Sequence, residues 1–451
     1  MVTPSSSPLR VAALIDLPRS PQSGGHVKCW ERLAQAAAHS ELPLDLTVYF
    51  SGRETSEILG PKARIRHLPP VFSTSHLKFL PYVPDHTDLA PYHPRLAREL
   101  PGYDIIHSTD GFFAFARTAE RVSRQLGTPL VTSFHTDTPA YTEIFTRDTI
   151  ERLVGKSNRV SNLLINAWRI PQKKRDGMVR RLATHVRACC HAVVTRAEDE
   201  QFAASLLGPE RVHHLRLGID RAMFGPHRNQ RIEVEADYGI PSGRLLVLFV
   251  GRLDVGKNIY TLIAAMEKLL AEGLPVHLVA AGIGPAENDL KTRLGANVSV
   301  PGFVEPNELG RLYASVDLLA LTSEVEMRSM VGVEALASGC PVLVAEKSGV
   351  AQLFNHTPAM KVVTGGAAPW TEALREIAIN PELRQYMRAE AFAYNEAHLA
   401  GWGDVLAEDL FAVWREAANQ TKLKPALASQ PNLENARFIW SKHSPSGASS
   451  G

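Results

Sequence analysis

Residues 245–258 read Leu-Leu-Val-Leu-Phe-Val-Gly-Arg-Leu-Asp-Val-Gly-Lys-Asn, six apolar residues followed by a loop with two glycines. The apolar run is typical of a strand buried on both faces of a parallel sheet. The residues that follow, 259–270, have apolar positions at helical spacing. This stretch therefore predicts a strand, a loop and a helix, the repeating unit of doubly wound α/β domains.

The same alternation of short apolar runs and helical patterns extends over most of the 451 residues, so we expect an α/β protein with parallel sheets. The predicted strands are Val11–Ile15, Leu44–Tyr49, Ile105–His107, Leu130–Phe134, Ala192–Thr195, Leu245–Val250, Val276–Ala280, Leu318–Leu321 and Val342–Val344. The predicted helices are Val27–Ser40, Phe113–Leu126, Ile259–Leu270, Pro306–Ser315 and Met330–Ser338.

The chain is too long for one ordinary core, and polar and turn-forming residues between Phe224 and Leu245 predict a linker. We expect an N-terminal Rossmann-like domain over 1–225 and a second one over 243–385. A helical segment over 386–420 and a disordered tail over 421–451 follow. Two such domains would place the carboxyl ends of their strands around a cleft, where α/β sheets bind ligands.

Composition narrows the class of protein. The formal net charge of +2 gives no global reason to expect nucleic acid as a partner. The four cysteines show no metal-binding spacing and predict reduced thiols in the cytoplasm. The sequence also shows no signal peptide and no apolar run long enough to span a bilayer. We expect a cytoplasmic protein that is soluble or peripheral to a membrane.

Two cations lie in the loop that follows the strand over 245–250. Arg252 and Lys257 are five residues apart, and the loop opens a helix whose first N–H groups are free to bind an anion. A departing nucleoside diphosphate needs this much positive charge. The alternative interpretation is a solvated loop with two surface cations.

A carboxylate inside an apolar helix marks a second motif. Glu334 lies within the apolar run Met330–Ala337, where a charge costs free energy unless it has a partner. Ribose hydroxyls are suitable donors to it. Glu326, eight residues earlier, could reach another part of the same ligand. The alternative is a carboxylate stabilised by the helix dipole, together with an exposed glutamate.

Taken in order, these motifs resemble those of the retaining glycosyltransferases of family 4, which have the GT-B fold of two Rossmann-like domains facing a cleft. The likeness extends over nearly the whole chain. The elements that carry it are Gly24-Gly25-His26, Ser-Phe-His-Thr-Asp-Thr-Pro-Ala-Tyr over 133–141, Leu217-Gly218-Ile219-Asp220 with Phe224 and Pro226, the loop 251–258, and Glu326-x7-Glu334-Ala-x-Ala-x-Gly-x-Pro-Val.

The resemblance implies a role for each matching residue. Arg252 and Lys257 would hold the donor diphosphate, Glu334 the ribose, and Glu326 the hydroxyls of the transferred sugar. His135 would face that sugar from the N-terminal domain. The implied catalytic residues are His135, Glu326, Arg252 and Lys257. The implied donor-binding residues are Gly25, Arg252, Lys257, Glu326, Met327, Arg328, Ser329, Met330 and Glu334. The resemblance implies no metal and no bound cofactor.

Two positions depart from the family pattern. The family often has Gly-Phe-Gly or Gly-Phe-Pro after the first glutamate, where this chain has Met327-Arg328-Ser329. Leu217 stands where the family usually has asparagine. These differences leave the identity of the sugar open more than the class of reaction.

The segment from Lys156 to His191 carries nine basic residues, and Asp176 is its one acidic residue. Leucine, isoleucine and Trp168 lie among the cations. Such a pattern is typical of a surface that rests on anionic lipid. The alternative is a solvated basic helix pair, and no recognised module favours nucleic acid. The predicted membrane-binding residues are Trp168, Lys173, Lys174 and Arg175, with the last three in an exposed loop.

We therefore expect a retaining, metal-independent hexosyltransferase that moves a sugar from a nucleotide-diphosphate donor to a hydroxyl acceptor. The expected acceptor is a membrane lipid or lipid-linked glycan, as in glycolipid or polysaccharide synthesis, and the expected place is the inner face of the plasma membrane. A soluble acceptor, a nucleotide-sugar-binding protein without turnover, and an epimerase or phosphorylase of the same architecture remain alternatives.

The resemblance yields a first prediction about the reaction. The product should keep the anomeric configuration of the donor, and turnover should continue in the presence of EDTA because cations of the chain neutralise the leaving group. NMR of the product and an assay with and without chelator measure both. An inverted product would remove the family assignment.

Overall fold

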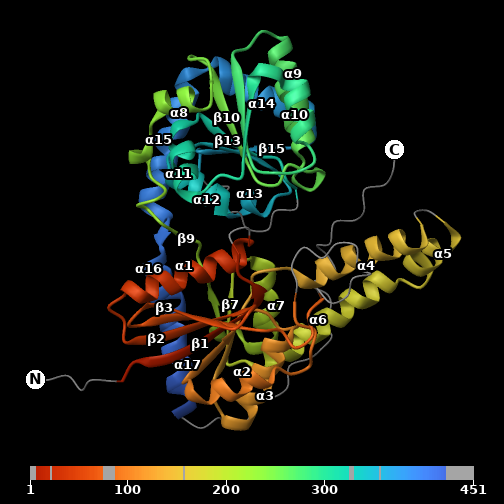
Figure 1. The fold of residues 1–451 in the computed structure, drawn as a ribbon, viewed down its shortest axis with the longest axis vertical. Coiled ribbons are helices and arrows are strands. Elements are labelled where there is room, and N and C mark those ends of the chain that lie inside the picture. Colours follow the sequence, from red (N-terminus) through yellow and green to blue (C-terminus); the bar gives the residue numbers. More distant parts are fainter. Residues whose placement is uncertain are drawn as a thin grey trace, which may run out of the picture. The chain divides into compact units, whose positions relative to one another are not determined.

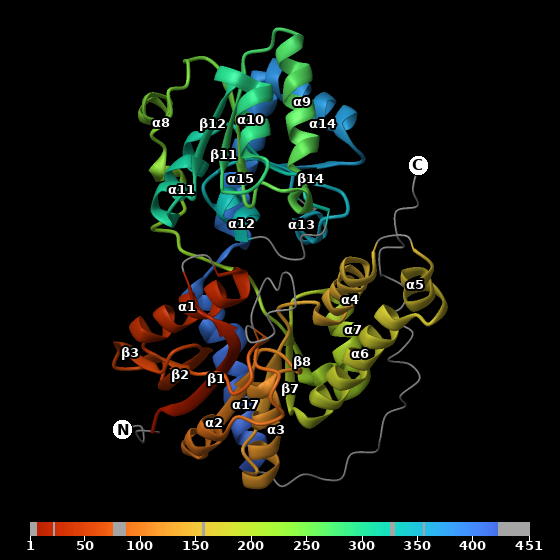
Figure 2. The same ribbon diagram turned by 45° about the vertical axis from the view of Figure 1, so that its right-hand side comes forward.

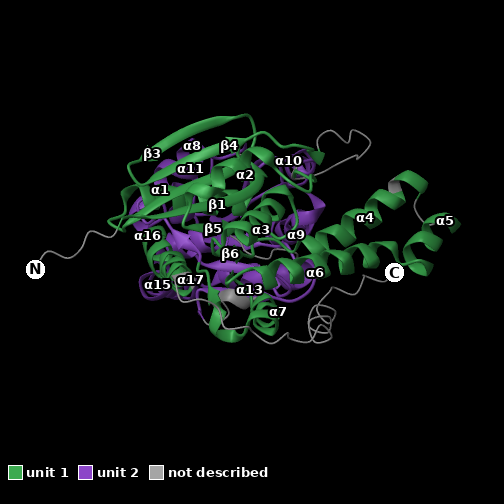
Figure 3. Cartoon of the chain, turned by 90° about the horizontal axis from the view of Figure 1, so that it is seen from below, with its two compact units in different colours: residues 1–216, 402–451 green, residues 217–401 purple. Residues whose placement is uncertain are grey.

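The computed structural model describes residues 7–20, 23–74, 87–155, 158–324, 330–354 and 357–422. The chain forms two compact units (Figure 3). Unit 1 contains the described residues up to Arg216 together with those from Trp402 onward, and unit 2 contains those of Leu217–Gly401. The chain therefore leaves unit 1 once, builds unit 2, and returns.

Unit 1 is built on an eight-stranded sheet in the order β3-β4-β2-β1-β5-β6-β7-β8. All neighbouring strands are parallel except the edge pair β3 and β4. The strands are β1 (Leu9–Pro18), β2 (Leu44–Ser51), β3 (Thr55–Gly60), β4 (Ala63–Leu68), β5 (Ile105–Ser108), β6 (Leu130–Ser133), β7 (His191–Val194) and β8 (Val212–His214).

Helices cover both faces of this sheet. Helix α3 packs on β1, β5 and β6, while α1 packs on β1 to β4 and α17 packs on β5 and β6. Helices α4 and α6 pack together and, with α5, project from the sheet (Figure 1). The helices are α1 (Gly25–His39), α2 (Pro94–Glu99), α3 (Ala114–Leu126), α4 (Thr138–Val154), α5 (Arg159–Asn162), α6 (Ile170–Ala188), α7 (Ala197–Leu207), α16 (Trp402–Asp404) and α17 (Ala412–Lys422), with short helical segments η2 (Leu100–Gly102), η3 (Leu163–Ala167), η4 (Pro209–Arg211) and η8 (Val405–Phe411).

Unit 2 has a six-stranded parallel sheet in the order β12-β11-β10-β13-β14-β15. Counted along the chain this is 3-2-1-4-5-6, the order of dinucleotide-binding folds. The strands are β10 (Leu245–Val250), β11 (Val276–Ala281), β12 (Val298–Gly302), β13 (Leu318–Leu321), β14 (Val342–Ala345) and β15 (Met360–Val363), beside the separate pair β9 (Gly218–Ile219) and β16 (Ala400–Gly401).

The alternation of side chains along β10 explains why both faces of the unit 2 sheet are covered. Leu245, Val247 and Phe249 pack with residues of α9, α10 and α14, while Leu246 and Leu248 pack with residues of α11, α12 and α15. Figure 2 shows α9 and α14 on one side of this sheet and α8 and α11 on the other. The helices are α8 (Arg231–Asp237), α9 (Ile259–Ala271), α10 (Glu287–Leu294), α11 (Pro306–Ser315), α12 (Met330–Ala337), α13 (Gly349–Phe354), α14 (Ala367–Ile379) and α15 (Pro381–His398), with short segments η5 (Pro226–Arg228), η6 (Val255–Lys257) and η7 (Gly295–Asn297).

The expected α/β class with two parallel-sheet domains is confirmed, and each predicted strand and helix coincides with an observed one to within a few residues. The unit boundaries differ from the predicted domains. The first change of unit comes at Arg216 rather than after residue 225, and the predicted helical segment is divided at residue 401 between the two units. Apart from Thr421 and Lys422, which end α17, the predicted tail lies outside the described residues. Within the described ranges, no helix is both long and apolar enough to cross a bilayer.

Contacts of residues 217–224 explain the earlier boundary. β9 pairs with β16, and the guanidinium of Arg221 donates to the carbonyl oxygens of Asn395 and Leu399 at 3.1 and 2.7 Å. Gly310 of α11 lies against the same segment: a Cβ atom there would be 2.1 Å from the carbonyl oxygen of Met223. The segment is therefore part of the unit 2 core.

Gly310→Ala tests this packing. The added methyl group forces α11 and the Met223 backbone apart, at a cost of about 1–3 kcal/mol or more. Chemical denaturation of the full chain should show a lower midpoint. Gly403→Ala is the matched control, since nothing lies within 4 Å of its added Cβ, and it should stay within about 1 kcal/mol of the wild type. Equal midpoints for the two variants would contradict the packing.

Candidate functional site

The strand order of unit 2 reverses between β10 and β13, and ligands of doubly wound sheets bind outside the carboxyl ends of the strands at such a point. The loop 251–258 leaves β10 there, and Thr322 and Ser323 leave β13 beside it. The structure therefore places the glycine-rich loop predicted from the sequence at the switch point of the sheet.

Backbone contacts fix this loop against the loop after β11. The N–H groups of Gly251 and Leu253 donate to the carbonyl oxygens of Ala281 and Ile283, each at 3.0 Å. A Cβ atom on Gly282 would lie 1.8 Å from the carbonyl oxygen of Gly251. Only glycine allows this approach, so the two loops touch through their backbones.

Hydrogen bonds also join the loops after β10 and β13. Asn258, with a left-handed φ of 54°, donates from Nδ2 to the carbonyl oxygen of Thr322 at 3.2 Å. The Thr322 hydroxyl donates to the carbonyl oxygen of Lys257 at 2.9 Å, and that of Ser323 to Gly256 at 3.4 Å. These bonds hold the start of α9 next to the residues that follow β13. The sequence predicted no role for these three side chains.

The two residues predicted to bind the diphosphate, Arg252 and Lys257, have side chains that lie over this loop. A Cβ atom on Gly251 would be 3.9 Å from Lys257 Cε, and one on Gly256 would be 3.9 Å from Arg252 Nη2. Both cationic side chains thus fold back over the glycines. Asp254 organises the turn by accepting from the Lys257 N–H at 3.0 Å and lies 3.4 Å from Arg252 Nε. The Arg252 side chain remains 58% exposed, so its guanidinium can reach a ligand.

Glu334 lies in α12, the helix that follows the loop after β13, and is half-buried. The hydroxyl of Tyr313, a fully buried residue of α11, donates to Glu334 Oε2 at 3.3 Å. The sequence predicted ribose hydroxyls as donors to this carboxylate. The structure shows that it also accepts a hydrogen bond from a tyrosine of the protein. Met330 is the first residue of α12, while Glu326, Met327, Arg328 and Ser329 lie outside the described residues.

In unit 1 the structure brings the two other predicted residues together. Gly25 is the first residue of α1, after an extended Gly24, and is exposed. His26, the next residue, stacks on His135 with ring centroids 4.3 Å apart and an angle of 5° between the rings. The N-terminal turn of α1 thus adjoins the imidazole that follows β6.

A buried chain of hydrogen bonds leads to His135. Trp414 of α17 donates from Nε1 to His107 Nδ1 at 2.9 Å, and His107 Nε2 lies 2.9 Å from the hydroxyl of Ser133. That hydroxyl lies 2.8 Å from His135 Nε2, to which Trp30 also donates at 3.2 Å. Sequence analysis assigned no role to Trp30, His107 or Trp414; the spacing of four between His26 and Trp30 on α1 was the available signal.

This chain determines where the hydrogens lie. Complete burial lowers the pKa of His107 to about 3, so its ring is neutral at physiological pH. Its Nδ1 accepts from Trp414, so its hydrogen is on Nε2 and is donated to Ser133. The Ser133 hydroxyl then donates to His135 Nε2, as Trp30 does. With Nε2 accepting, neutral His135 carries its hydrogen on Nδ1.

The predicted membrane-binding residues lie on the projecting helices of unit 1. Trp168 is 54% exposed, and Lys173 and Lys174 are exposed. The expectation of an exposed loop is wrong, because these lysines lie in the first turns of α6, which begins at Ile170. Arg175 is largely covered and pairs with Glu143 of α4 at 3.0 Å, so it is held between α4 and α6 rather than presented to solvent.

Other elements also offset the charge of the basic segment. Arg181 pairs with Glu120 of α3, on which the His185 ring also hydrogen bonds at 2.6 Å. Exposed apolar side chains nevertheless gather on the projecting helices. They are Tyr141, Ile144, Leu153, Val160, Leu163 and Trp168.

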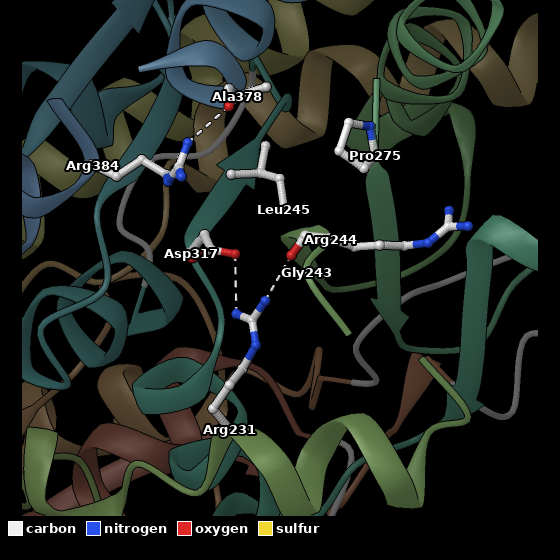
Figure 4. A pocket seen from close by; sticks show the side chains of 8 residues that line it. All are labelled: Arg231, Gly243, Arg244, Leu245, Pro275, Asp317, Ala378 and Arg384. Carbon is white, nitrogen blue, oxygen red and sulfur yellow. Dashed lines mark hydrogen bonds and ion pairs between the residues drawn. The ribbon is translucent and has the colours of Figure 1, made fainter. Parts of the chain in front are cut away.

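A cavity of about 240 Å³ lies at the other end of the unit 2 strands, beside Leu245 and Pro275 (Figure 4). Its cations are engaged in the fold. Arg231 bonds to Asp317 at 3.0 Å and to the carbonyl oxygen of Arg244 at 2.7 Å, and Arg384 bonds to that of Ala378 at 2.8 Å. We therefore assign this cavity no part in donor binding.

Two protein-family models match the chain. The model described as Glycosyltransferase Family 4 matches residues 23–222, and the one described as Glycosyl transferases group 1 matches residues 230–393. The first lies almost wholly in unit 1 and the second within unit 2.

Known proteins resemble the chain over large parts of its length. It is 30% identical to a sulfoquinovosyl transferase of Arabidopsis thaliana, over 58% of this chain and 46% of the other. It is 27% identical to an alpha-monoglucosyldiacylglycerol synthase of Streptococcus pneumoniae, over 53% and 51%. The chain thus spans about half the length of these two relatives. A crystal structure of HepE from Anabaena in complex with UDP-glucose matches with a TM-score of 0.59 and 17% identity, over 92% of this chain and all of that one.

Trp414→Phe tests the hydrogen-bond chain to His135. Phenylalanine fills most of the same space but removes the donor to His107 Nδ1, so His107 should no longer hold one tautomer. Ring-nitrogen NMR should show hydrogen on His107 Nε2 and His135 Nδ1 in the wild type, and mixed tautomers of His107 in the variant. If His135 acts on the substrate, kcat falls roughly 2- to 12-fold, the equivalent of one net hydrogen bond.

Trp370→Phe is the control, since Trp370 is a fully buried tryptophan in the core of unit 2. It should leave the ring-nitrogen spectrum of His107 and His135 unchanged. Identical spectra for wild type and Trp414→Phe would contradict the assigned tautomers.

Proposed function

Because the chain belongs to the group 1 glycosyltransferases with the GT-B fold, we propose that it transfers a sugar from a nucleotide-diphosphate donor to a hydroxyl acceptor with retention of configuration. The observation that carries the proposal is the loop 251–258 at the switch point of unit 2, over which Arg252 and Lys257 fold. The relative of the same fold, HepE, holds UDP-glucose, a donor of this class.

The donor diphosphate binds at this loop. Its negative charge meets two cations and the N-terminal end of α9, and the loop is already fixed by its contacts with the loops after β11 and β13. Fixed charges need no rearrangement when the bond to the leaving phosphate breaks, so they stabilise that transition state most. In this proposal the reaction needs no metal, since Arg252 and Lys257 supply the positive charge.

For the remaining site residues we propose the roles that the family resemblance implies. Glu334 binds the ribose hydroxyls, with Tyr313 holding one of its oxygens. By this resemblance, Glu326 binds the transferred sugar, and residues 327–330 contribute to donor binding. By the same resemblance, His135 contacts the sugar, and Gly25 lets the backbone approach the diphosphate or the acceptor.

Arg252→Ala and Lys257→Ala test the diphosphate site. Each removes a charge-assisted hydrogen bond of about 1.5–3 kcal/mol, so kcat/KM for the donor should fall on the order of 10- to 150-fold. Glu334→Gln should weaken binding of the free nucleoside diphosphate, while Glu326→Gln should weaken only the sugar-bearing donor. Calorimetry and a nucleotide-release assay across UDP-, GDP- and ADP-sugars, with lipid extract present, provide the measurements.

Matched controls remove a cation from the same unit. Lys268 lies on the exposed face of α9. Arg293 lies near the end of α10 and pairs with Glu267 of α9. Alanine at either position should leave kcat/KM within about twofold of the wild type, since surface changes are small. Wild-type turnover in Arg252→Ala or Lys257→Ala would refute the site. Donor binding with no transfer to any acceptor would favour a binding protein.

The proposed acceptor is a membrane lipid or lipid-linked glycan at the inner face of the plasma membrane. The supporting feature is the end of the projecting helices, where Trp168 and Leu163 are exposed and Lys173 and Lys174 follow on α6. An aromatic residue beside cations is typical of a surface that rests on anionic lipid. The Streptococcus pneumoniae relative is an alpha-monoglucosyldiacylglycerol synthase, and a glycolipid product is consistent with such an acceptor.

Replacing Lys173 and Lys174 with serine, together with Trp168→Ala, should reduce sedimentation with anionic vesicles at low salt. Each cation near such a surface contributes about 1 kcal/mol, and salt should weaken the wild-type binding. Donor binding should not change, because the replaced residues lie in unit 1.

The control variant carries Lys268→Ser and Lys291→Ser, which remove the same charge from exposed positions of unit 2. It should sediment like the wild type. A wild-type protein that stays in the supernatant at low salt would indicate a soluble acceptor instead.

A further inference from the structure

Two histidines and a glutamate from distant parts of the sequence meet in unit 1. His191 is the first residue of β7, His213 lies on β8, and Glu416 lies on α17. One nitrogen from each ring and one carboxylate oxygen all lie within 4.8 Å of one another. The two rings are in contact, with His191 Nδ1 2.9 Å from His213 Nε2.

A fourth side chain orients two of these groups. Gln420, one helical turn after Glu416, accepts from His191 Nε2 at 3.2 Å and donates from Nε2 to Glu416 Oε1 at 3.0 Å. A histidine that binds a metal through one ring nitrogen characteristically donates a hydrogen bond from the other nitrogen to an oxygen acceptor, which fixes the ring and its tautomer. The hydrogen bond to Gln420 leaves the lone pair of His191 Nδ1 directed at His213 and away from Gln420.

The hydrogen bonds of the cluster suit a cation. Two ring nitrogens 2.9 Å apart share one hydrogen, and His191 carries its hydrogen on Nε2, which donates to Gln420, so its Nδ1 accepts. His213 Nε2 therefore donates its hydrogen to His191 Nδ1. Moving that hydrogen to His213 Nδ1 presents two ring lone pairs to an ion without releasing a proton. His191 is buried and His213 half-buried, while Glu416 is exposed, so an ion can enter from solvent.

We propose that His191, His213 and Glu416 form a site for a divalent transition-metal ion, with Zn²⁺ as the best fit to two nitrogens and one carboxylate oxygen. Tetrahedral bonds of about 2.1 Å separate ligand atoms by about 3.4 Å, so the two rings need to part by about half an ångström. Water completes the coordination on the exposed side.

The ion would have a structural role, distinct from the transfer reaction. β6 and β7 are parallel, and Val131 of β6 is level with His191. His135 follows the carboxyl end of β6, whereas His191 opens β7, so the cluster lies toward the other end of the strands. Because α17 supplies Glu416 and Gln420, the ion would join the last described helix to β7 and β8 and stabilise the native state.

Zinc calorimetry on the EDTA-stripped full chain tests the site, together with the visible absorption of the Co²⁺ form. Wild-type protein should bind one ion per chain, and Co²⁺ should give the visible bands of a tetrahedral nitrogen–oxygen site without a near-ultraviolet thiolate band. Zn²⁺ should also raise the thermal midpoint, while turnover at lower temperature is the same with and without EDTA.

Variants assign the ligands. His213→Gln and Glu416→Gln should each abolish the saturable step, and Gln420→Leu should weaken it roughly 10- to 100-fold. His214→Gln is the matched control: it is the next residue on β8, its side chain is exposed, and it pairs with Glu200. It should bind zinc like the wild type.

Glu416 is at the surface, so its variant should fold even if the histidine variants do not. A wild-type chain with no saturable zinc step, or a step that survives Glu416→Gln, would overturn the proposal. A thiolate band in the Co²⁺ spectrum would also overturn it, since it would assign the ion to a cysteine.

Discussion

Burial of both faces of two parallel sheets is the constraint that sets the positions of the candidate donor loop and of His135. β10 places Leu245, Val247 and Phe249 under one layer of helices and Leu246 and Leu248 under the other, so every side chain of this strand before Val250 is buried. The charged groups of the donor loop therefore lie beyond the end of the strand. The loop after β10 and the histidine after β6 lie at carboxyl ends for this reason.

Close contact between backbones then fixes the loop that follows β10. Where Gly282 meets Gly251, two loops touch with no side chain between them, and the Asn258 and Thr322 bonds add a third loop. A loop held on two sides keeps its N–H groups and its cations in place before any ligand arrives. Electrostatic stabilisation is strongest when such groups need not reorganise.

The sequence predicted what depends on local pattern. β10 and α11 were placed to the residue, because continuous apolar runs and amphipathic spacing are local signals. The edge strand β3 was missed, since its exposed residues 55–58 lack alternation. The bond from Trp414 to His107 joins residues 307 positions apart, which no motif could reveal. The prediction that Arg175 faces solvent is wrong, since its partner Glu143 lies on another helix and no local pattern indicates the pair. Motifs thus identified the loops of the candidate site, while the side chains that position His135 required the fold.

The return of the chain to unit 1 affects the order in which the protein can fold during synthesis. Domains usually fold as they emerge, the N-terminal one first. Here α17 cannot pack on the N-terminal sheet until all of unit 2 has been synthesised. Until then the His107 ring lacks its hydrogen bond from Trp414. Until then β5 and β6 expose apolar surface that α17 later covers. Unit 2, which is contiguous in sequence, can complete its core earlier. The ribosome therefore releases a chain whose second unit can be finished before its first.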